Sequence, residues 1–214
     1  EEEICKYLIK GCFPLAPLAV FALHRLTDKV AQSNRTLFTF LLSDNENSLG
    51  DFIYNNRGQF WLSGDIIYDY FEEAIWGENR ESDIYNVWKE VNKAINKAED
   101  NEINIKIIKV IGLIYIIDDF DRAKPNIQHI SLLLPQYNIE EIKTSIDELV
   151  EMKIIFYRKI YDTYKFYEGS DLNLQDKIDS LVEEHRENIN LIDVLNNYFL
   201  PSPIIPRRYN DNHR

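Results

Sequence analysis

The chain has 214 residues, of which 45% are hydrophobic and 13% aromatic, and this composition suits a packed core and excludes an intrinsically disordered protein. Its formal net charge of -12 disfavours long-range attraction to phosphate backbones. The two cysteines, Cys5 and Cys12, are too few for a disulfide framework. The longest apolar run, Val110 to Ile117, is too short to cross a bilayer, and there is no signal peptide. We therefore expect a cytoplasmic protein with no membrane partner.

Apolar residues at helical spacing predict a helical region in the first hundred residues. Ser63 and Ser82 are expected to cap the last two helices. The second helix is apolar nearly all round, so we expect it to be buried. Trp61, Trp76 and Trp88 lie beside aliphatic residues, which favours core packing over a base-stacking platform. The helices are expected at residues 18–30, 35–42, 49–54, 64–76 and 83–98, with Ser33 or Asn34 as the cap of the second.

A polar break at Glu99–Glu102 is the predicted end of this first domain, residues 1–101. Its last part is strongly acidic, with ten acids and four bases between residues 61 and 101. We expect this domain to be a helical, lid-like subdomain.

The next segment, residues 102–170, changes its hydrophobic period partway along. Three helices are expected at residues 103–117, 127–134 and 138–152, and the first should be the most buried. Beyond them the period drops to two, which predicts strands at 153–160 and 163–167 around a turn at Tyr161-Asp162. Three helices followed by a hairpin are the order of a winged helix. Gly112, within the first of them, predicts a close helix crossing.

Two further helices are expected in the last segment, residues 171–214, at 174–186 and 191–199, before a proline-containing extended exit. The fold class predicted for the whole chain is therefore mainly α: a helical lid-like subdomain, a winged helix and a C-terminal helical extension.

The third helix of a winged helix usually reads the major groove of DNA. Here residues 138–152 carry five acids and a single base, Lys143, so this face should repel DNA. Three bases, Arg158, Lys159 and Lys165, cluster in the hairpin among tyrosines and are the candidate contacts to a phosphate backbone. A solvated, charge-protected hairpin edge is the simpler interpretation of the same three residues. We expect weak or no direct nucleic-acid binding.

Catalytic signatures are missing from the sequence. There is no G-x-x-x-x-G-K-S/T phosphate loop, and the four histidines have no partners at metal-ligand spacing. Asp118, Asp119 and Asp121 follow an apolar helix and are expected to mark its solvated end rather than an acid–base or cation site. We therefore expect no catalytic residue and no metal site in this chain.

Four segments resemble large prokaryotic AAA-like P-loop ATPases, a family often linked to antiphage defence. Residues 12–18 and 30–41 are similar to a P-L-H-P-L-T stretch and a Q-N-E-R-T-L-F-x-F-L run that follow the nucleotide-binding core, with Ala16 in place of His and Ser33-Asn34 in place of Asn-Glu. Residues 161–171 resemble Y-D-T-Y-K-x-W-E-G-S-D, with Tyr167 at the Trp position, and residues 207–210 match R-R-Y-N. The resemblance covers most of the chain and implies that it is the middle of a longer polypeptide.

The resemblance implies that the parent protein binds ATP and Mg²⁺ and that Arg35 senses the nucleotide phosphates, a task that suits the forked guanidinium. A surface or ion-paired Arg35, for example with Asp28, is the structural alternative. The implied function is the regulatory lid and winged-helix portion of a P-loop ATPase in a defence or DNA-transaction system. Its partners would be the parent's nucleotide-binding core or a neighbouring subunit, and an effector protein. A DNA-binding winged-helix regulator and a non-catalytic protein–protein adaptor using the acidic helices are the alternative functions.

Overall fold

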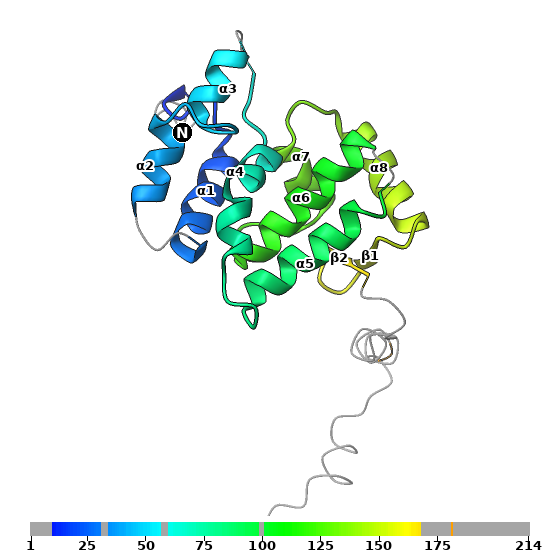
Figure 1. The fold of residues 1–214 in the computed structure, drawn as a ribbon. Helices are drawn as coiled ribbons and strands as arrows, with labels where there is room; N and C mark the ends of the chain where they lie inside the picture. The colour runs from blue at the N-terminus through cyan, green and yellow to red at the C-terminus, as the bar shows by residue number, and fades with distance from the viewer. Residues whose placement is uncertain (1–9, 31–33, 57–59, 99–100, 168–180, 182–214) are drawn as a thin grey trace, which may run out of the picture. The chain divides into compact units, whose positions relative to one another are not determined.

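The computed structural model describes residues 10–30, 34–56, 60–98, 101–167 and 181. Among these residues, eight helices and a two-stranded antiparallel sheet make the fold mainly helical (Figure 1). The chain divides into two compact units, Glu1–Ser170 and Asp171–Arg214. The predicted boundaries at residues 101 and 170 stay predictions, and residue 101 lies within the first unit. The expected C-terminal helices lie outside the described residues.

Three helices begin the described chain: α1 (Pro17–Val30), α2 (Asn34–Leu42) and α3 (Leu49–Asn55). Proline at the first position of α1 fits that helix because its missing N–H would have no intrahelical acceptor there. The Ser48 hydroxyl caps α3 by accepting a hydrogen bond from the Asp51 N–H. These helices are close to their predicted positions.

Two longer helices follow, α4 (Gly64–Trp76) and α5 (Asp83–Ile95). The Ser82 hydroxyl accepts a hydrogen bond from the Tyr85 N–H, as predicted for the cap of α5. Ser63 occupies the corresponding position before α4, but its side chain makes no capping hydrogen bond. Helix α5 ends three residues before the predicted Ala98.

The centre of the first unit is α6 (Glu102–Ile117), which packs against α1, α4, α5, α7 and α8. Ten of its 16 residues are buried, as its nearly uniform apolar sequence predicts. Gly112 lies where α6 meets α5, and a Cβ atom there would collide with Cγ2 of Val91. The close crossing predicted at Gly112 is therefore confirmed.

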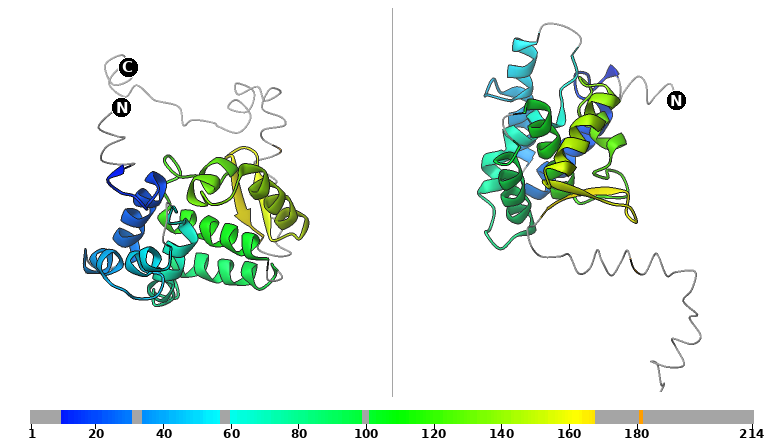
Figure 2. Two further views of the ribbon diagram at one scale, coloured as in Figure 1. Left: turned by 90° about the horizontal axis from the view of Figure 1, so that it is seen from above. Right: turned by 90° about the vertical axis from the view of Figure 1, so that its right-hand side faces the viewer.

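The remaining elements are α7 (Ile127–Leu133), α8 (Ile139–Glu151), β1 (Ile155–Arg158) and β2 (Thr163–Phe166). A capping box starts α8, because Asn138 and Glu141 each accept a hydrogen bond from the other's backbone N–H. The two strands pair with Ile155 opposite Phe166 and Arg158 opposite Thr163. Strand β1 contacts α8 and β2 contacts α5, an arrangement that can be followed in Figure 2.

Two sequence-based expectations about burial differ from the structure. Helix α2 is not buried all round, because Phe38 and Leu42 are exposed. Trp76 is 59% exposed and lies outside the core. Trp61 and Trp88, by contrast, pack against the core as predicted. Periodicity shows which residues share a helix face, but it does not show whether another helix covers that face.

The hairpin is shorter than expected, since four residues, 159–162, connect the strands in place of a two-residue turn. Asp162 has a left-handed conformation with φ of 53° in this connection. No helix in the described part of the chain is long and apolar enough to cross a membrane.

Candidate functional site

Two neighbouring helices, α2 and α3, present large apolar side chains to solvent. Phe38 and Leu42 of α2 are 57% and 80% exposed, and Ile53 and Tyr54 of α3 are 53% and 74% exposed. We call these four residues the α2–α3 face. Helices α2 and α3 pack against each other (Figure 1). Large apolar side chains that stay exposed on neighbouring helices are candidates for a protein–protein contact.

Arg35 is the second residue of α2, so it begins the same helix that carries Phe38 and Leu42. Its side chain lies outside the described part of the structure. Asp28 is the acid suggested as the structural partner of Arg35. Its Oδ2 atom lies 3.1 Å from Nδ1 of His24, one turn earlier on α1. The structure therefore shows a partner for Asp28 and places the backbone of Arg35 next to the α2–α3 face.

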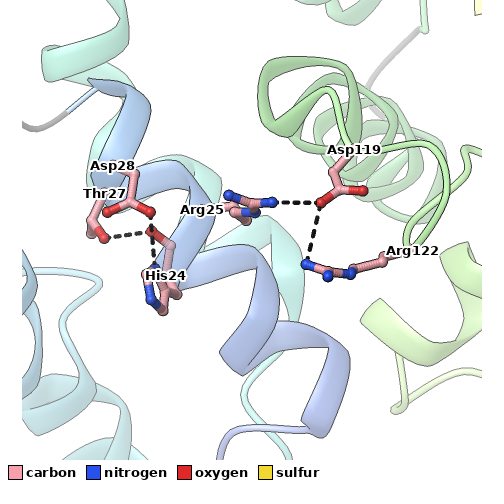
Figure 3. Close-up of polar contacts among 6 residues, drawn as sticks. All are labelled: His24, Arg25, Thr27, Asp28, Asp119 and Arg122. Atoms are coloured by element: carbon pink, nitrogen blue, oxygen red, sulfur yellow. Dashed lines mark hydrogen bonds and ion pairs between the residues drawn. The ribbon is translucent and has the colours of Figure 1, made fainter.

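A cluster of ionic side chains joins α1 to the loop that follows α6 (Figure 3). The Nη2 atom of Arg25 donates a hydrogen bond to Oδ2 of Asp119 at 2.8 Å. The same carboxylate oxygen lies 3.7 Å from Nη1 of Arg122, and Lys29 Nζ lies 3.6 Å from Oδ2 of Asp118. We call these five residues the α1–α6 junction. It links the helix just before α2 to the end of the central helix.

Asp119 is the centre of the α1–α6 junction. Its side chain is 17% exposed, whereas that of Asp118 is 65% exposed. The expectation of a solvated helix end is therefore correct for Asp118 and Asp121 and wrong for Asp119, which two guanidinium groups cover. Both guanidinium groups also lie 5.9 Å from the ring centre of Phe21, so an aromatic ring supports the ionic contacts.

A pocket of about 400 Å³ opens beside the α1–α6 junction and is lined by charged residues of both signs. Four acids and two bases line it, together with Ile117 and Phe120: Asp28, Asp118, Asp119, Asp121, Arg25 and Lys29. Because Arg25 and Lys29 already form ion pairs across the junction, these charges hold the two segments together rather than face a common ligand.

The three basic residues predicted to contact nucleic acid all lie in the hairpin. Arg158 ends β1, Lys165 lies on β2, and Lys159 is exposed in the connection. By the strand register, Arg158 and Lys165 project from the same face of the sheet. The Arg158 guanidinium carbon lies 4.3 Å from the ring centre of Tyr161, which fixes it above that ring. The structure thus brings Arg158 and Lys165 to one face.

Hydrogen bonds hold the hairpin against the helices. The Tyr115 hydroxyl donates to the Tyr164 carbonyl at 2.9 Å, and the Asn126 amide donates to Oδ2 of Asp162 at 2.8 Å. The Tyr157 hydroxyl donates to Oδ1 of Asp162 at 2.8 Å. The hydrogen bonds from Tyr157 and Asn126 lower the pKa of Asp162 below its ordinary value. The bond to Asp162 raises the pKa of Tyr157. The hairpin is therefore a fixed element.

A basic stripe on α5 was missed from the sequence because residues 61–101 are acidic as a whole. Three of the four bases in that block, Lys89, Lys93 and Lys97, are spaced four residues apart, and all three are exposed. The spacing is the signal that identifies such a stripe, because residues four apart share a helix face. The Arg25–Asp119 contact has no comparable signal, since the residues are 94 positions apart.

Comparison of the chain with protein-family models, curated proteins and solved structures found no match.

Proposed function

We propose that this chain is the regulatory lid and winged-helix portion of a P-loop ATPase in a bacterial defence or DNA-transaction system. It would relay the nucleotide state of the parent's core to a partner or to a neighbouring subunit. The parent would hold ATP and Mg²⁺, and this chain would contribute Arg35 toward the phosphates. The chemistry of nucleotide hydrolysis would belong to the parent's core, because this sequence has no phosphate loop.

The α2–α3 face is the observation that carries the proposal. Phe38 and Leu42 lie one turn apart on the helix that Arg35 begins, and both are more than half exposed. If this face rests on the nucleotide-binding core, the apolar side chains are covered and Arg35 is held near the nucleotide. Burial of a large apolar side chain stabilises such a contact by about 1.5–3 kcal/mol.

The α1–α6 junction supplies the mechanical connection that a relay requires. Arg25 and Lys29 of α1 bind acids at the end of α6, and α6 packs directly against α7 and α8. A displacement of α1 would therefore act on the helices that precede the hairpin. Helices α6, α7 and α8 followed by β1 and β2 have the order of a winged helix, which supports that assignment.

Sequence-specific reading of duplex DNA by α8 is disfavoured on electrostatic grounds. Its outward face carries exposed acids, and its one base, Lys143, lies 2.9 Å from Oε1 of Glu140. The exposed acids are Glu140, Glu141, Asp147, Glu148 and Glu151. A phosphate backbone would be repelled by this face. The winged helix would accordingly act through protein contacts.

The docking role can be tested by making the α2–α3 face polar in the parent ATPase. Phe38→Ser combined with Leu42→Ser should lower ATP hydrolysis. The melting temperature of the isolated chain should change little, because exposed substitutions usually alter stability by less than about 0.5 kcal/mol. Leu132→Ser combined with Ile139→Ser is the matched control, since these two side chains are 50% and 47% exposed on α7 and α8. Unchanged hydrolysis in the Phe38/Leu42 variant would contradict the docking role.

A further inference from the structure

A groove lies between α5 and the hairpin, and its lining includes no residue of the α2–α3 face or of the α1–α6 junction. It has a volume of about 670 Å³. Lys89, Lys93 and Lys97 line it from the α5 side, and Ile154, Phe166 and Tyr167 line it from the hairpin side. We call it the α5–hairpin groove.

The α5 side of the groove is a row of positive charge. Lys89 and Lys93 are one turn apart on α5, which separates them by about 6 Å along the helix, and Lys97 follows in the turn after the helix. All three are exposed, and none forms an ion pair with an acid in the part of the chain that the structure describes. Glu90 also lines the groove and offsets part of this charge.

The hairpin side is apolar and aromatic. Ile154 and Phe166 are each 2% exposed and form the floor, whereas Tyr167 is 46% exposed at the rim. The Tyr167 N–H donates to the Ile154 carbonyl at 2.8 Å, which continues the ladder beyond β2. The Tyr167 ring also meets Phe156 edge-on, with ring centres 6.3 Å apart. The aromatic face at the rim is therefore held in place before a ligand arrives.

We propose that the α5–hairpin groove binds single-stranded nucleic acid without sequence preference. A strand running along α5 would place successive phosphates opposite successive lysines and an unpaired base on Tyr167. A cationic track beside an aromatic platform is the arrangement by which proteins hold single strands. A duplex keeps its bases stacked inside and cannot offer one to Tyr167. An acidic peptide could pair with the lysines, but its carboxylates supply no flat surface for the ring.

This binding mode differs from the expected weak contact through the hairpin tip. That expectation rested on the acidic face of α8 and on Arg158, Lys159 and Lys165, whereas the groove uses lysines of α5. The positive stripe lies within the most acidic block of the sequence, so the net charge conceals it.

Fluorescence anisotropy of the 214-residue protein with a labelled oligothymidylate tests the proposal. If three phosphates are contacted, log K should fall against log salt concentration with a slope of about -2, since single strands give about -0.7 per phosphate. Affinity should then fall roughly twentyfold between about 50 and 200 mM salt. Most of this salt dependence should be lost in the triple variant Lys89→Gln, Lys93→Gln and Lys97→Gln.

The matched control is Lys10→Gln, Arg80→Gln and Lys143→Gln combined, which removes the same charge from positions outside the groove and should retain the wild-type slope. Tyr167→Leu should weaken binding by about fivefold or more, whereas Tyr167→Phe, which keeps the ring, should not. Equal losses in the two triple variants would overturn the assignment to the groove. So would competition by polyglutamate as strong as that by unlabelled oligothymidylate, because the site would then fit an acidic polypeptide. Failure here would leave the α2–α3 docking test unaffected.

Discussion

Arg25 and Asp119 are 94 positions apart in the sequence, yet Nη2 of the first donates a 2.8 Å hydrogen bond to Oδ2 of the second. The arginine side chain is 41% exposed and the aspartate 17% exposed, so water screens the pair only in part. This contact is the most direct link between α1 and the end of α6.

A double-mutant cycle should measure this link. Using Arg25→Met and Asp119→Asn, we expect a coupling free energy of about 1 kcal/mol in urea unfolding, at the upper end of the range for exposed pairs. The same cycle on Lys143 and Glu140, whose side chains are 44% and 77% exposed, should give a coupling near zero. If the two couplings were equal, the α1–α6 junction would contribute no more than an ordinary surface pair.

Gly112 should be intolerant of even one added carbon. An alanine Cβ at this position would collide with Val91, so Gly112→Ala should destabilise the protein by about 1–3 kcal/mol. Helix propensity alone predicts the opposite, a gain of about 1 kcal/mol. Adding Val91→Ala should recover part of the loss, although Val91→Ala alone is destabilising. A higher melting temperature for Gly112→Ala would contradict the close α5–α6 crossing.

Two tyrosines, the buried Tyr68 and the half-buried Tyr115, should differ in their response to loss of the hydroxyl group. The Tyr68 hydroxyl has no hydrogen-bond partner among the described residues, and burial raises the pKa of Tyr68 above its ordinary value. Tyr68→Phe should therefore be neutral or stabilising in thermal unfolding. Tyr115→Phe should instead cost about 0.5–1.5 kcal/mol, because it removes the hydrogen bond to the Tyr164 carbonyl. A larger loss for Tyr68→Phe than for Tyr115→Phe would contradict this assignment.

The sequence predicted the helices well because their apolar residues recur at helical spacing and because Ser82 marks the start of α5. It also predicted the hairpin after α8, from the change of period near Met152. Both signals are local, and the structure follows them to within a few residues.

The same signals could not predict which faces are covered. Phe38, Leu42 and Trp76 are exposed because no described helix packs over them, and this depends on tertiary arrangement rather than on spacing. The α1–α6 junction was missed for a similar reason, since Asp119 follows an apolar helix in the way that solvated acids do. The lysine stripe of α5 could have been found, because Lys89 and Lys93 share a helix face in any α-helix.

The hairpin connection should weaken in acid. An Asp in an unfolded chain has a pKa of about 3.9, and hydrogen bonds from Tyr157 and Asn126 lower the pKa of folded Asp162. The stabilisation is therefore fully present above about pH 4 and is lost as the pH falls through the lower, folded pKa. Carbon-13 NMR titration of the Asp162 carboxyl should show its pKa rising toward 3.9 in Tyr157→Phe. Tyr54→Phe, on α3, should leave it unchanged.

ATP hydrolysis by the proposed parent ATPase carrying Arg35→Ala tests the relay most directly. Arg80→Ala, at an exposed position before α5, is the control for loss of one positive charge. If Arg35 reaches the nucleotide phosphates, hydrolysis should fall by at least about tenfold in Arg35→Ala and stay at the wild-type rate in Arg80→Ala. Wild-type hydrolysis and nucleotide affinity in Arg35→Ala would contradict the account.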